Sequence, residues 1–199
     1  MEFYEAIRRR KMVRRYVDSP VEREAVDRIL DAARRGPSAG FAQGVEFVAV
    51  TEADRRMAIA EAAGEPDYVA KGFTPWLSTA PVHVVVAVNV DRYLDRYGED
   101  DKSGIEEWTA PYWWVDAGAA LMVLLLAATE EGLAAGFLGG HSAPGLEQAV
   151  GLPDRYRALG VVTIGHPDRA PVVGSATRAR RPRSDVVHLE QWGGDGESG

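Results

Sequence analysis

Ala117 to Ala128 has the sequence AGAALMVLLLAA, twelve residues without a charged side chain. Acidic residues bracket this stretch, with Asp116 before it and Glu130 and Glu131 after it. A membrane-spanning helix needs about 20 apolar residues, so the stretch is too short to cross a bilayer. A helix that is apolar on every side is instead buried on every side. The stretch therefore predicts a central helix packed between its own sheet and a second subunit, without membrane contact.

Four segments with strand composition lie on either side of this helix in the sequence. The most continuous is Pro81 to Val88, PVHVVVAV, which is typical of a strand buried on both faces. The other three are Glu46 to Thr51, Gly132 to Gly140 and Arg157 to His166. Segments with helical spacing of apolar residues alternate with these strands, at Glu22 to Arg35, Asp54 to Ala63 and Pro144 to Val150. The alternation predicts a compact α+β sandwich, in which helices flank a small central sheet.

Length and composition suit one soluble globular domain. The chain has 199 residues, of which 46% are hydrophobic, and we expect a single domain over residues 1–192 with a disordered tail at 193–199. It contains no cysteine, which excludes disulfides, thiolate metal sites and a cysteine nucleophile, and which favours a reducing compartment. Met1 to Glu5 does not resemble a secretory signal, so we expect a cytoplasmic protein.

Positive charge is concentrated near the two ends of the chain, although the formal net charge is -7. The first cluster has six cations within eight residues and the second has four, namely Arg8, Arg9, Arg10, Lys11, Arg14 and Arg15, and then Arg178, Arg180, Arg181 and Arg183. Such clusters can be solvated surface. Nucleic-acid-binding domains tend to be basic overall, whereas this composition has a pI of about 5.2, so we expect no nucleic acid. If the two clusters meet, they form a site for a small anion such as phosphate.

Several other kinds of site are excluded by their sequence patterns. The four histidines lack the spacing of a metal site, so we predict no bound metal. Ser38 lies in Gly-Pro-Ser-Ala-Gly, which does not match the nucleophile elbow Gly-x-Ser-x-Gly of hydrolases. The glycine fingerprint of dinucleotide-binding folds and the phosphate loop ending in Gly-Lys-Ser/Thr are both missing from the sequence.

Three motifs occur in an order that resembles the nitroreductase family of FMN-dependent oxidoreductases. They are Ile7-x-x-Arg10-Lys11-Met12-x-Arg14-x-Tyr16, then Pro37-Ser38-Ala39-Gly40-x-x-Gln43, and finally Arg180-Arg181-Pro182 with Val186-Val187-His188 and Trp192. The similarity extends from Phe3 to Trp192 and includes the Gly-x-x-Gly-Gly turn that ends at Gly140. It implies an intertwined α+β homodimer with a mostly antiparallel sheet and with two FMN sites in the subunit interface.

The resemblance also implies roles for individual residues. Arg10, Lys11, Met12 and Arg14 would bind the FMN phosphate and ribityl chain, and Arg180 and Arg181 would close on the phosphate. The loop of the partner subunit would press on the flavin ring with its Pro37, Ser38, Ala39, Gly40 and Gln43. Gly139 and Gly140 would let backbone amides approach the ring, because glycine has no Cβ. The flavin rather than a protein side chain would carry the chemistry.

The implied activity is transfer of hydride from NADH or NADPH, via the flavin, to a small conjugated acceptor such as a nitroaromatic or quinone. Aromatic residues could line the acceptor pocket, and we choose Phe41, Tyr112 and Trp113, together with His141. Lys11-Met12 stands where the family commonly has Arg-Ser, and Phe41 stands where it commonly has Asn. These departures keep two alternatives open: a specialised member, such as a dehydrogenase, dehalogenase, flavin-consuming or deazaflavin-linked enzyme, and a non-catalytic flavin carrier.

Overall fold

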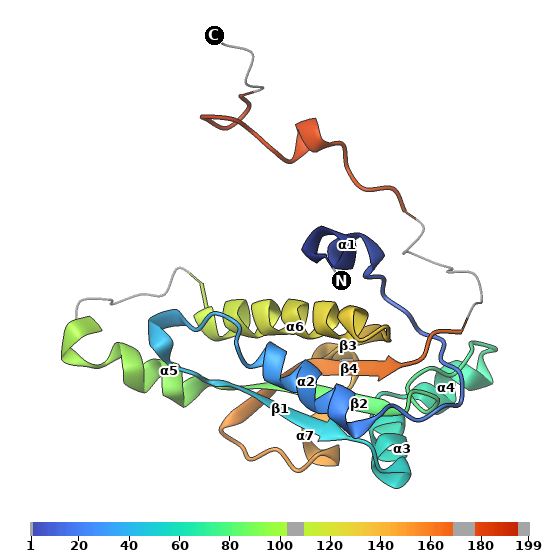
Figure 1. Cartoon of the computed structure of the whole chain (residues 1–199). Coiled ribbons are helices and arrows are strands. Elements are labelled where there is room, and N and C mark those ends of the chain that lie inside the picture. The colour runs from blue at the N-terminus through green and yellow to red at the C-terminus, as the bar shows by residue number, and fades with distance from the viewer. Residues whose placement is uncertain (1, 103–109, 169–177, 195–199) are drawn as a thin grey trace. The chain divides into compact units, whose positions relative to one another are not determined.

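The computed structural model of the chain describes residues 2–102, 110–168 and 178–194. The chain divides into two compact units, residues 1–169 and residues 170–199, and each is described by itself. The first unit contains the whole sheet and the long helices (Figure 1). Most of the tail for which we predict disorder, 193–199, lies outside the described residues, and the single domain over 1–192 stays a prediction.

The sheet has four strands in the order β1-β2-β4-β3, and every neighbouring pair is antiparallel. Their bounds are β1 Val45–Val50, β2 Val82–Asn89, β3 Ala134–Gly139 and β4 Tyr156–Gly165. All eight residues of β2 are buried, which confirms the prediction of a strand covered on both faces. The register between β2 and β4 shifts at Val86 and Ala87, opposite Gly160. These strands confirm the predicted small antiparallel sheet.

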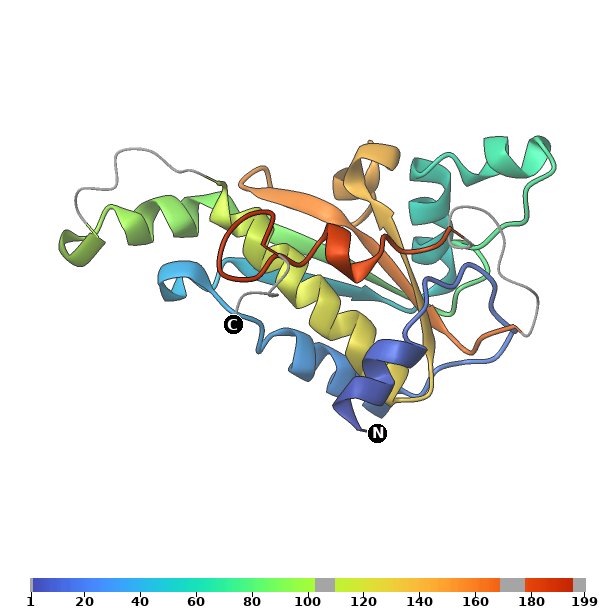
Figure 2. The same ribbon diagram turned by 90° about the horizontal axis from the view of Figure 1, so that it is seen from above.

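Helices cover both faces of the sheet, so the first unit has three layers. The α2 helix (Arg23–Ala33) and the α6 helix (Tyr112–Glu130) pack on one face, where Val84 and Val86 of β2 point. The α3 helix (Ala53–Ala62) and the α7 helix (Leu146–Ala149) pack on the other face, where Val85 points. This arrangement follows from the alternation of side chains along a strand. Figures 1 and 2 show α6 crossing above the sheet, with α3 and α7 below it in Figure 1.

The remaining helices are short and lie outside these layers. They are α1 (Phe3–Arg9), α4 (Glu65–Ala70) and α5 (Val90–Tyr97). The α1 helix contacts α6, and Figure 1 shows it on the side of α6 that faces away from the sheet. The α4 helix was not predicted from the sequence, and it precedes the loop that leads into β2.

The α6 helix has 19 residues and is longer than its twelve-residue apolar stretch. Among the described residues it is the one helix long and apolar enough to cross a membrane, so length alone does not exclude a span. Its packing does identify it as a core helix, because Ala117, Leu124 and Ala128 are fully buried in the main hydrophobic cluster. On its outer side Val115 is 52% exposed and Met122 39% exposed. The prediction that its inner side packs on the sheet is confirmed.

The described part of the second unit, residues 178–194, has a single turn of 3-10 helix at Arg183–Asp185. The Arg181 guanidinium donates a hydrogen bond from Nη2 to the carbonyl of Asp185 over 2.8 Å. The rings of His188 and Trp192 lie 4.4 Å apart, centroid to centroid. These contacts are internal to the unit.

Candidate functional site

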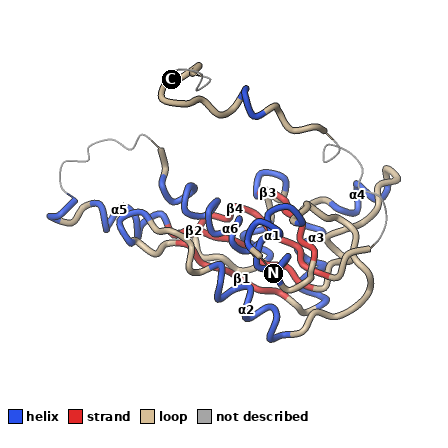
Figure 3. The backbone as a smooth tube through the Cα atoms, turned by 45° about the horizontal axis from the view of Figure 1, so that its top comes forward, coloured by secondary structure: helices blue, strands red, loops and turns tan. Residues whose placement is uncertain are grey.

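The basic segment after α1 runs beside the edge strand β3. Met12 pairs with Ala135 in a parallel bridge, and the Val13 N–H donates to the Ala135 carbonyl over 2.9 Å. Edge strands expose unpaired backbone groups, and this segment covers those at the start of β3. Figure 3 shows α1 next to α6 and β3 in the same region of the protein. The predicted phosphate-binding residues Arg10, Lys11, Met12 and Arg14 are therefore held along one strand.

Arg10 carries the clearest sign of a missing partner at this strand. Its Nε atom is buried and has no hydrogen-bond partner among the described residues. A buried guanidinium N–H without an acceptor costs free energy, and the phosphate of a flavin nucleotide offers charged acceptor oxygens. The donor set of Arg10, Lys11 and Arg14 thus fits the phosphate group of FMN.

Arg14 lies over the ring of Trp76, with the guanidinium carbon 5.2 Å from the ring centroid. The same ring covers Gly136 of β3, where an added Cβ would lie 3.0 Å from Trp76 and 2.3 Å from the Val13 carbonyl. Glycine is therefore required at position 136 by close packing. Arg15, the next residue, donates to the Thr74 hydroxyl over 3.4 Å. The loop that carries Thr74 and Trp76 therefore contacts the basic segment through both of these residues.

Glu65, the first residue of α4, holds that loop in place. Glu65 as a whole is only 6% exposed, and its carboxylate accepts three backbone N–H groups, from Trp76 at 2.7 Å, Leu77 at 2.6 Å and Ser78 at 2.9 Å. Burial opposes ionisation of Glu65, but the hydrogen bonds from the Ser78 side chain and these amides lower its pKa below the ordinary value of 4.5. Glu65 is therefore held as a carboxylate.

The loop with Pro37, Ser38, Ala39, Gly40 and Gln43 is anchored to α5 and α6. Buried Asp116 of α6 accepts the Ala39 N–H and the Tyr93 hydroxyl, each over 2.8 Å and both at Oδ2. Arg96 of α5 donates to the Gly40 carbonyl over 2.8 Å, and the Ser38 hydroxyl accepts the Gln43 N–H over 2.7 Å.

The backbone of this loop has an unusual shape. Gly40, Phe41 and Gln43 have φ angles of 58°, 59° and 51°, in the left-handed region that costs energy for residues with a Cβ. Phe41 is 74% exposed. A large exposed aromatic residue on a tightly held loop is suited to contact another molecule.

The glycine turn follows the end of β3. An added Cβ on Gly140 would lie 2.7 Å from the Ala158 carbonyl, and one on Gly139 would lie 2.8 Å from the His141 ring. The backbone contact requires glycine at position 140, a reason that we did not predict, whereas the contact at Gly139 is with the side chain of His141, which is exposed and can move. Close approach of a ring to their amides stays a prediction.

The two other aromatic pocket candidates lie at the start of α6. Trp113 packs edge-on against Tyr93, with centroids 6.2 Å apart, and it borders the main core. Tyr112 is 38% exposed. Both residues lie near the loop of residues 37–43, because Tyr93 joins that loop to α6 through Asp116.

The candidate residues of the first unit thus form two groups within one protomer. One group lies along β3 and comprises the basic segment and the glycine turn, and the other comprises the loop of residues 37–43 with Tyr112 and Trp113. Figures 1 and 2 show α1 and this loop toward opposite ends of α6. Arg180 and Arg181 belong to the second unit, so their predicted convergence with Arg10 stays a prediction.

A comparison with models of known protein families shows which family has this sequence pattern. The family model described as "Nitroreductase family" matches residues 7–166, which include both groups. The chain belongs to the nitroreductase family. The match confirms the predicted family membership and accounts for the shared order of the motifs up to His166.

Curated nitroreductase relatives are similar over nearly the whole chain. The chain is 28% identical to an NADPH-flavin oxidoreductase from Vibrio harveyi over 190 residues, which cover 94% of this chain and 73% of that protein. It is 29% identical to an FMN reductase [NAD(P)H] from Bacillus subtilis over 191 residues, covering 92% and 71%. The solved structure of NADPH:FMN oxidoreductase from Vibrio harveyi complexed with NAD+ superposes with a TM-score of 0.72, at 26% identity, covering 94% and 76%. These similarities confirm the predicted nitroreductase fold.

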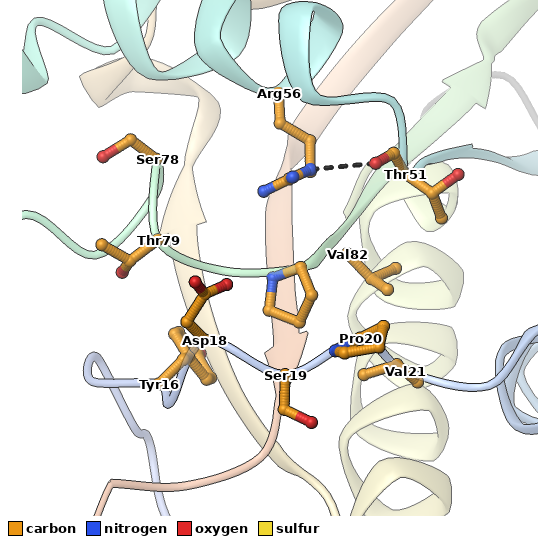
Figure 4. A pocket seen from close by; sticks show the side chains of 11 residues that line it. Tyr16, Asp18, Ser19, Pro20, Val21, Thr51, Arg56, Ser78, Thr79 and Val82 are labelled. Carbon is orange, nitrogen blue, oxygen red and sulfur yellow. Dashed lines mark hydrogen bonds between the residues drawn. The ribbon is translucent and has the colours of Figure 1, made fainter.

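A pocket of the protein lies away from the predicted site residues. It has a volume of about 590 Å³ and lies between the segment Tyr16 to Val21 and the loop before β2 (Figure 4). Arg56 extends into it but donates to the carbonyls of Thr51 at 3.0 Å and Ala80 at 2.6 Å, and so ties α3 to that loop. None of the residues that we predict to bind flavin or acceptor lines this pocket. That is expected if the flavin site of a nitroreductase is completed by a second chain.

Histidines do not contribute a metal site in the described part of this nitroreductase. No group of three or more His, Asp or Glu side chains within residues 2–102, 110–168 and 178–194 could hold an ion. His83 is fully buried on β2 and donates from Nε2 to the Leu77 carbonyl over 2.8 Å. Its Nδ1 has no hydrogen-bond partner among the described residues.

Sequence reasoning did not identify the residues that hold both groups in place. These are Glu65, Tyr93, Arg96 and Asp116, which contact the site segments through hydrogen bonds. A signal was present for Asp116, because it is the acidic residue that directly precedes the apolar stretch and yet lies within the helix. No comparable signal marks Glu65, whose partners are backbone amides.

Proposed function

We propose that this nitroreductase is an FMN-dependent oxidoreductase that uses NADH or NADPH to reduce a small conjugated acceptor, such as a nitroaromatic or a quinone. Family membership supports this function, as do the relatives named NADPH-flavin oxidoreductase and FMN reductase. The structural observation that carries it is the buried Nε of Arg10, which has no hydrogen-bond partner in the described part of the chain and belongs to a row of cations along β3. Such a row suits a phosphorylated cofactor in an otherwise acidic protein.

Arg10, Lys11 and Arg14 would bind the phosphate and ribityl chain of FMN, with Met12 contributing main-chain groups. Guanidinium groups provide paired, fixed donors for phosphate oxygens, and Arg14 is already oriented by the Trp76 ring. Arg180 and Arg181 of the second unit would complete the phosphate site. Gly139 and Gly140 would allow backbone amides to approach the ring.

The proposed active form is a homodimer, because the two groups of site residues lie apart within one protomer. The loop with Pro37, Ser38, Ala39, Gly40 and Gln43 would reach the cofactor of the other protomer, and its rigid anchoring by Asp116 and Arg96 would set its position. Phe41, Tyr112, Trp113 and His141 would line the space for the acceptor. Flat aromatic side chains suit a flat conjugated molecule.

Bound FMN would supply the two-electron chemistry, and the protein would supply binding, orientation and exclusion of water. The residues along β3 would fix the phosphate end, while the aromatic residues would limit water at the ring. No side chain of the chain has to act as a nucleophile. We also propose a cytoplasmic location, which is supported by the complete lack of cysteine.

The absorbance spectrum of the freshly purified protein tests this function. We expect a yellow protein that loses its colour when NADH or NADPH is added without oxygen, and regains it when a quinone or nitroaromatic is added. A colourless protein that does not bind added FMN would contradict the proposal. Tight binding of FMN without reduction by either nicotinamide would instead favour a flavin carrier.

A further inference from the structure

Glu65 accepts hydrogen bonds from three consecutive backbone N–H groups, and all three belong to a loop outside its own helix. One carboxylate oxygen accepts from Trp76 and Leu77, and the other accepts from Ser78. The Glu65 residue is only 6% exposed, so water competes little for these bonds. Hydrogen bonds to an ionised acceptor are about twice as strong as those between neutral groups. The conformation of residues 76–78 is therefore set by one side chain.

The hydrogen bonds of Glu65 fix the backbone position of Trp76 directly. Its ring covers Gly136 of the edge strand β3, where even a Cβ would come within 3.0 Å of it. Arg14 lies over the same ring, with the guanidinium carbon 5.2 Å from the ring centroid. Arg14 is otherwise exposed, and an arginine side chain on a surface samples many rotamers. The ring is thus the described contact that restricts where this guanidinium lies.

We propose that Glu65 is a positioning residue for FMN binding: it holds the Trp76 ring against β3, and the ring holds the Arg14 guanidinium in the direction of the FMN phosphate. The effect on FMN binding rests on the proposed function. The positioning of Arg14 by Glu65 and Trp76 does not require a bound flavin. Restricting Arg14 before binding reduces the entropy lost when it contacts phosphate. Glutamine is a poor substitute at position 65, because its NH2 group would face a backbone N–H donor.

The first experiment measures the position of Arg14 in the flavin-free, full-length protein by NMR. Protons next to a guanidinium that lies over an indole ring are shifted upfield by the ring current. We expect this shift for the Arg14 δ protons in the wild type, its loss in Trp76→Ala, and a clear reduction in Glu65→Gln. An unchanged Arg14 shift in a folded Glu65→Gln protein would overturn the proposal, whether or not the protein binds FMN.

The second experiment measures FMN affinity by titration in a double-mutant cycle. We expect Trp76→Ala and Glu65→Gln each to weaken FMN binding roughly 2- to 5-fold, the size of a surface cation–π contact. If both residues act through Arg14, neither change should weaken binding further by more than about 1.5-fold in an Arg14→Ala background. Additive losses would overturn the proposal, since they would mean that Trp76 or Glu65 acts independently of Arg14.

Glu147→Gln is the matched control for both experiments. Glu147 of α7 is partly buried and also accepts a backbone N–H, that of Ala158, over 2.8 Å, but its hydrogen bond is to β4 and not to the loop that carries Trp76. We expect normal FMN affinity and a normal Arg14 shift in this variant. If Glu65→Gln does not fold, Glu65→Asp, which keeps the charge and shortens its reach, takes its place in both experiments. Failure of the wild type to bind FMN would count against the proposed function alone, because the NMR experiment decides the positioning role separately.

Discussion

Three buried titratable side chains, Glu65, His83 and Asp116, are held by hydrogen bonds rather than by charges of opposite sign. Glu65 accepts backbone amides, His83 donates to a carbonyl, and Asp116 accepts one amide and one hydroxyl. The bonds of Asp116 join residues 23 and 77 positions apart, whereas that of His83 joins residues 6 positions apart. The folded protein lowers the pKa of Glu65 and the pKa of His83, so its stability should depend on pH through these two groups.

The lowered pKa of His83 predicts that the folded protein loses stability in mild acid. Burial lowers the pKa of His83 from 6.5 to about 4, so between these values the unfolded chain binds a proton that the folded protein does not. Stability must then fall as pH falls from 6.5 to 4, by about 3 kcal/mol from this residue. His83→Gln keeps a donor for the Leu77 carbonyl but does not titrate. Urea unfolding across this pH range should show a smaller decrease for His83→Gln than for wild type, with exposed His141→Gln behaving like wild type.

Arg14→Ala should weaken FMN binding about 10-fold or more, because a hydrogen bond to a charged group contributes about 1.5–3 kcal/mol. Arg23→Ala is the control, since Arg23 is also exposed and pairs only weakly with Asp27, at 3.8 Å. Its FMN affinity should equal that of the wild type. Equal affinities of the wild type and Arg14→Ala in a fluorescence titration would remove Arg14 from the phosphate site.

At the scale of elements, α6 both forms the core and anchors the loop of residues 37–43. Ala117 and Leu124 bury one side of the helix, while Asp116 reaches the loop at Ala39 and the α5 helix at Tyr93. Burial and the nearby Asp116 carboxylate raise the pKa of Tyr93, so the tyrosine remains a proton donor to that carboxylate. The loop is therefore fixed before any cofactor or partner arrives.

This anchoring predicts different costs for two replacements of Asp116. Asp116→Ala would leave the Ala39 N–H and the Tyr93 hydroxyl buried without an acceptor, at about 1–3 kcal/mol for each group. Asp116→Asn keeps an oxygen at the same place and should cost less. Urea unfolding should give the stability order wild type, then Asp116→Asn, then Asp116→Ala. Equal stability of the two variants would show that Oδ2 is not the acceptor that matters.

At the scale of the whole molecule, apolar surface remains on the side of α6 that faces away from the sheet. Val115 and Met122 of α6 are exposed there, and α1, which lies on that side, exposes Phe3 by 63% and Tyr4 by 72%. Apolar surface of this kind is typical of an interface between protein chains. A second copy of the chain would cover it and would also bring the loop of residues 37–43 to the cations along β3.

Met122→Glu should therefore give a monomer that binds FMN poorly, because burying an unpaired carboxylate in an apolar interface is costly. Met57→Glu is the matched control: Met57 lies on α3, is 46% exposed, and faces away from this surface. Light scattering coupled to size-exclusion chromatography should show a dimer for the wild type and for Met57→Glu. A dimeric Met122→Glu protein would exclude this surface as the interface.

Sequence reasoning predicted the sheet and the long helices well. Pro81 to Val88 and the stretch within α6 are apolar at nearly every position, and a segment of that kind can be stable only when it is buried on all sides. It did not predict α4, whose sequence EPDYVA has no apolar periodicity, and it set several element ends one or two residues away. Short polar elements depend on contacts made elsewhere in the fold, as the contact between Glu65 and residues 76–78 shows.

For the candidate site, sequence alone determined which chemical groups are present: a row of cations, a loop of small residues and a glycine turn. Only the tertiary structure decided where they lie, with the cations along β3 and the loop fastened to α5 and α6. The bonds that fasten the loop join residues 23 to 77 positions apart, such as Tyr93 to Asp116 and Ala39 to Asp116, and the bond that places the cations joins Val13 to Ala135. No local pattern encodes such pairs, because each depends on how the intervening chain packs as a whole.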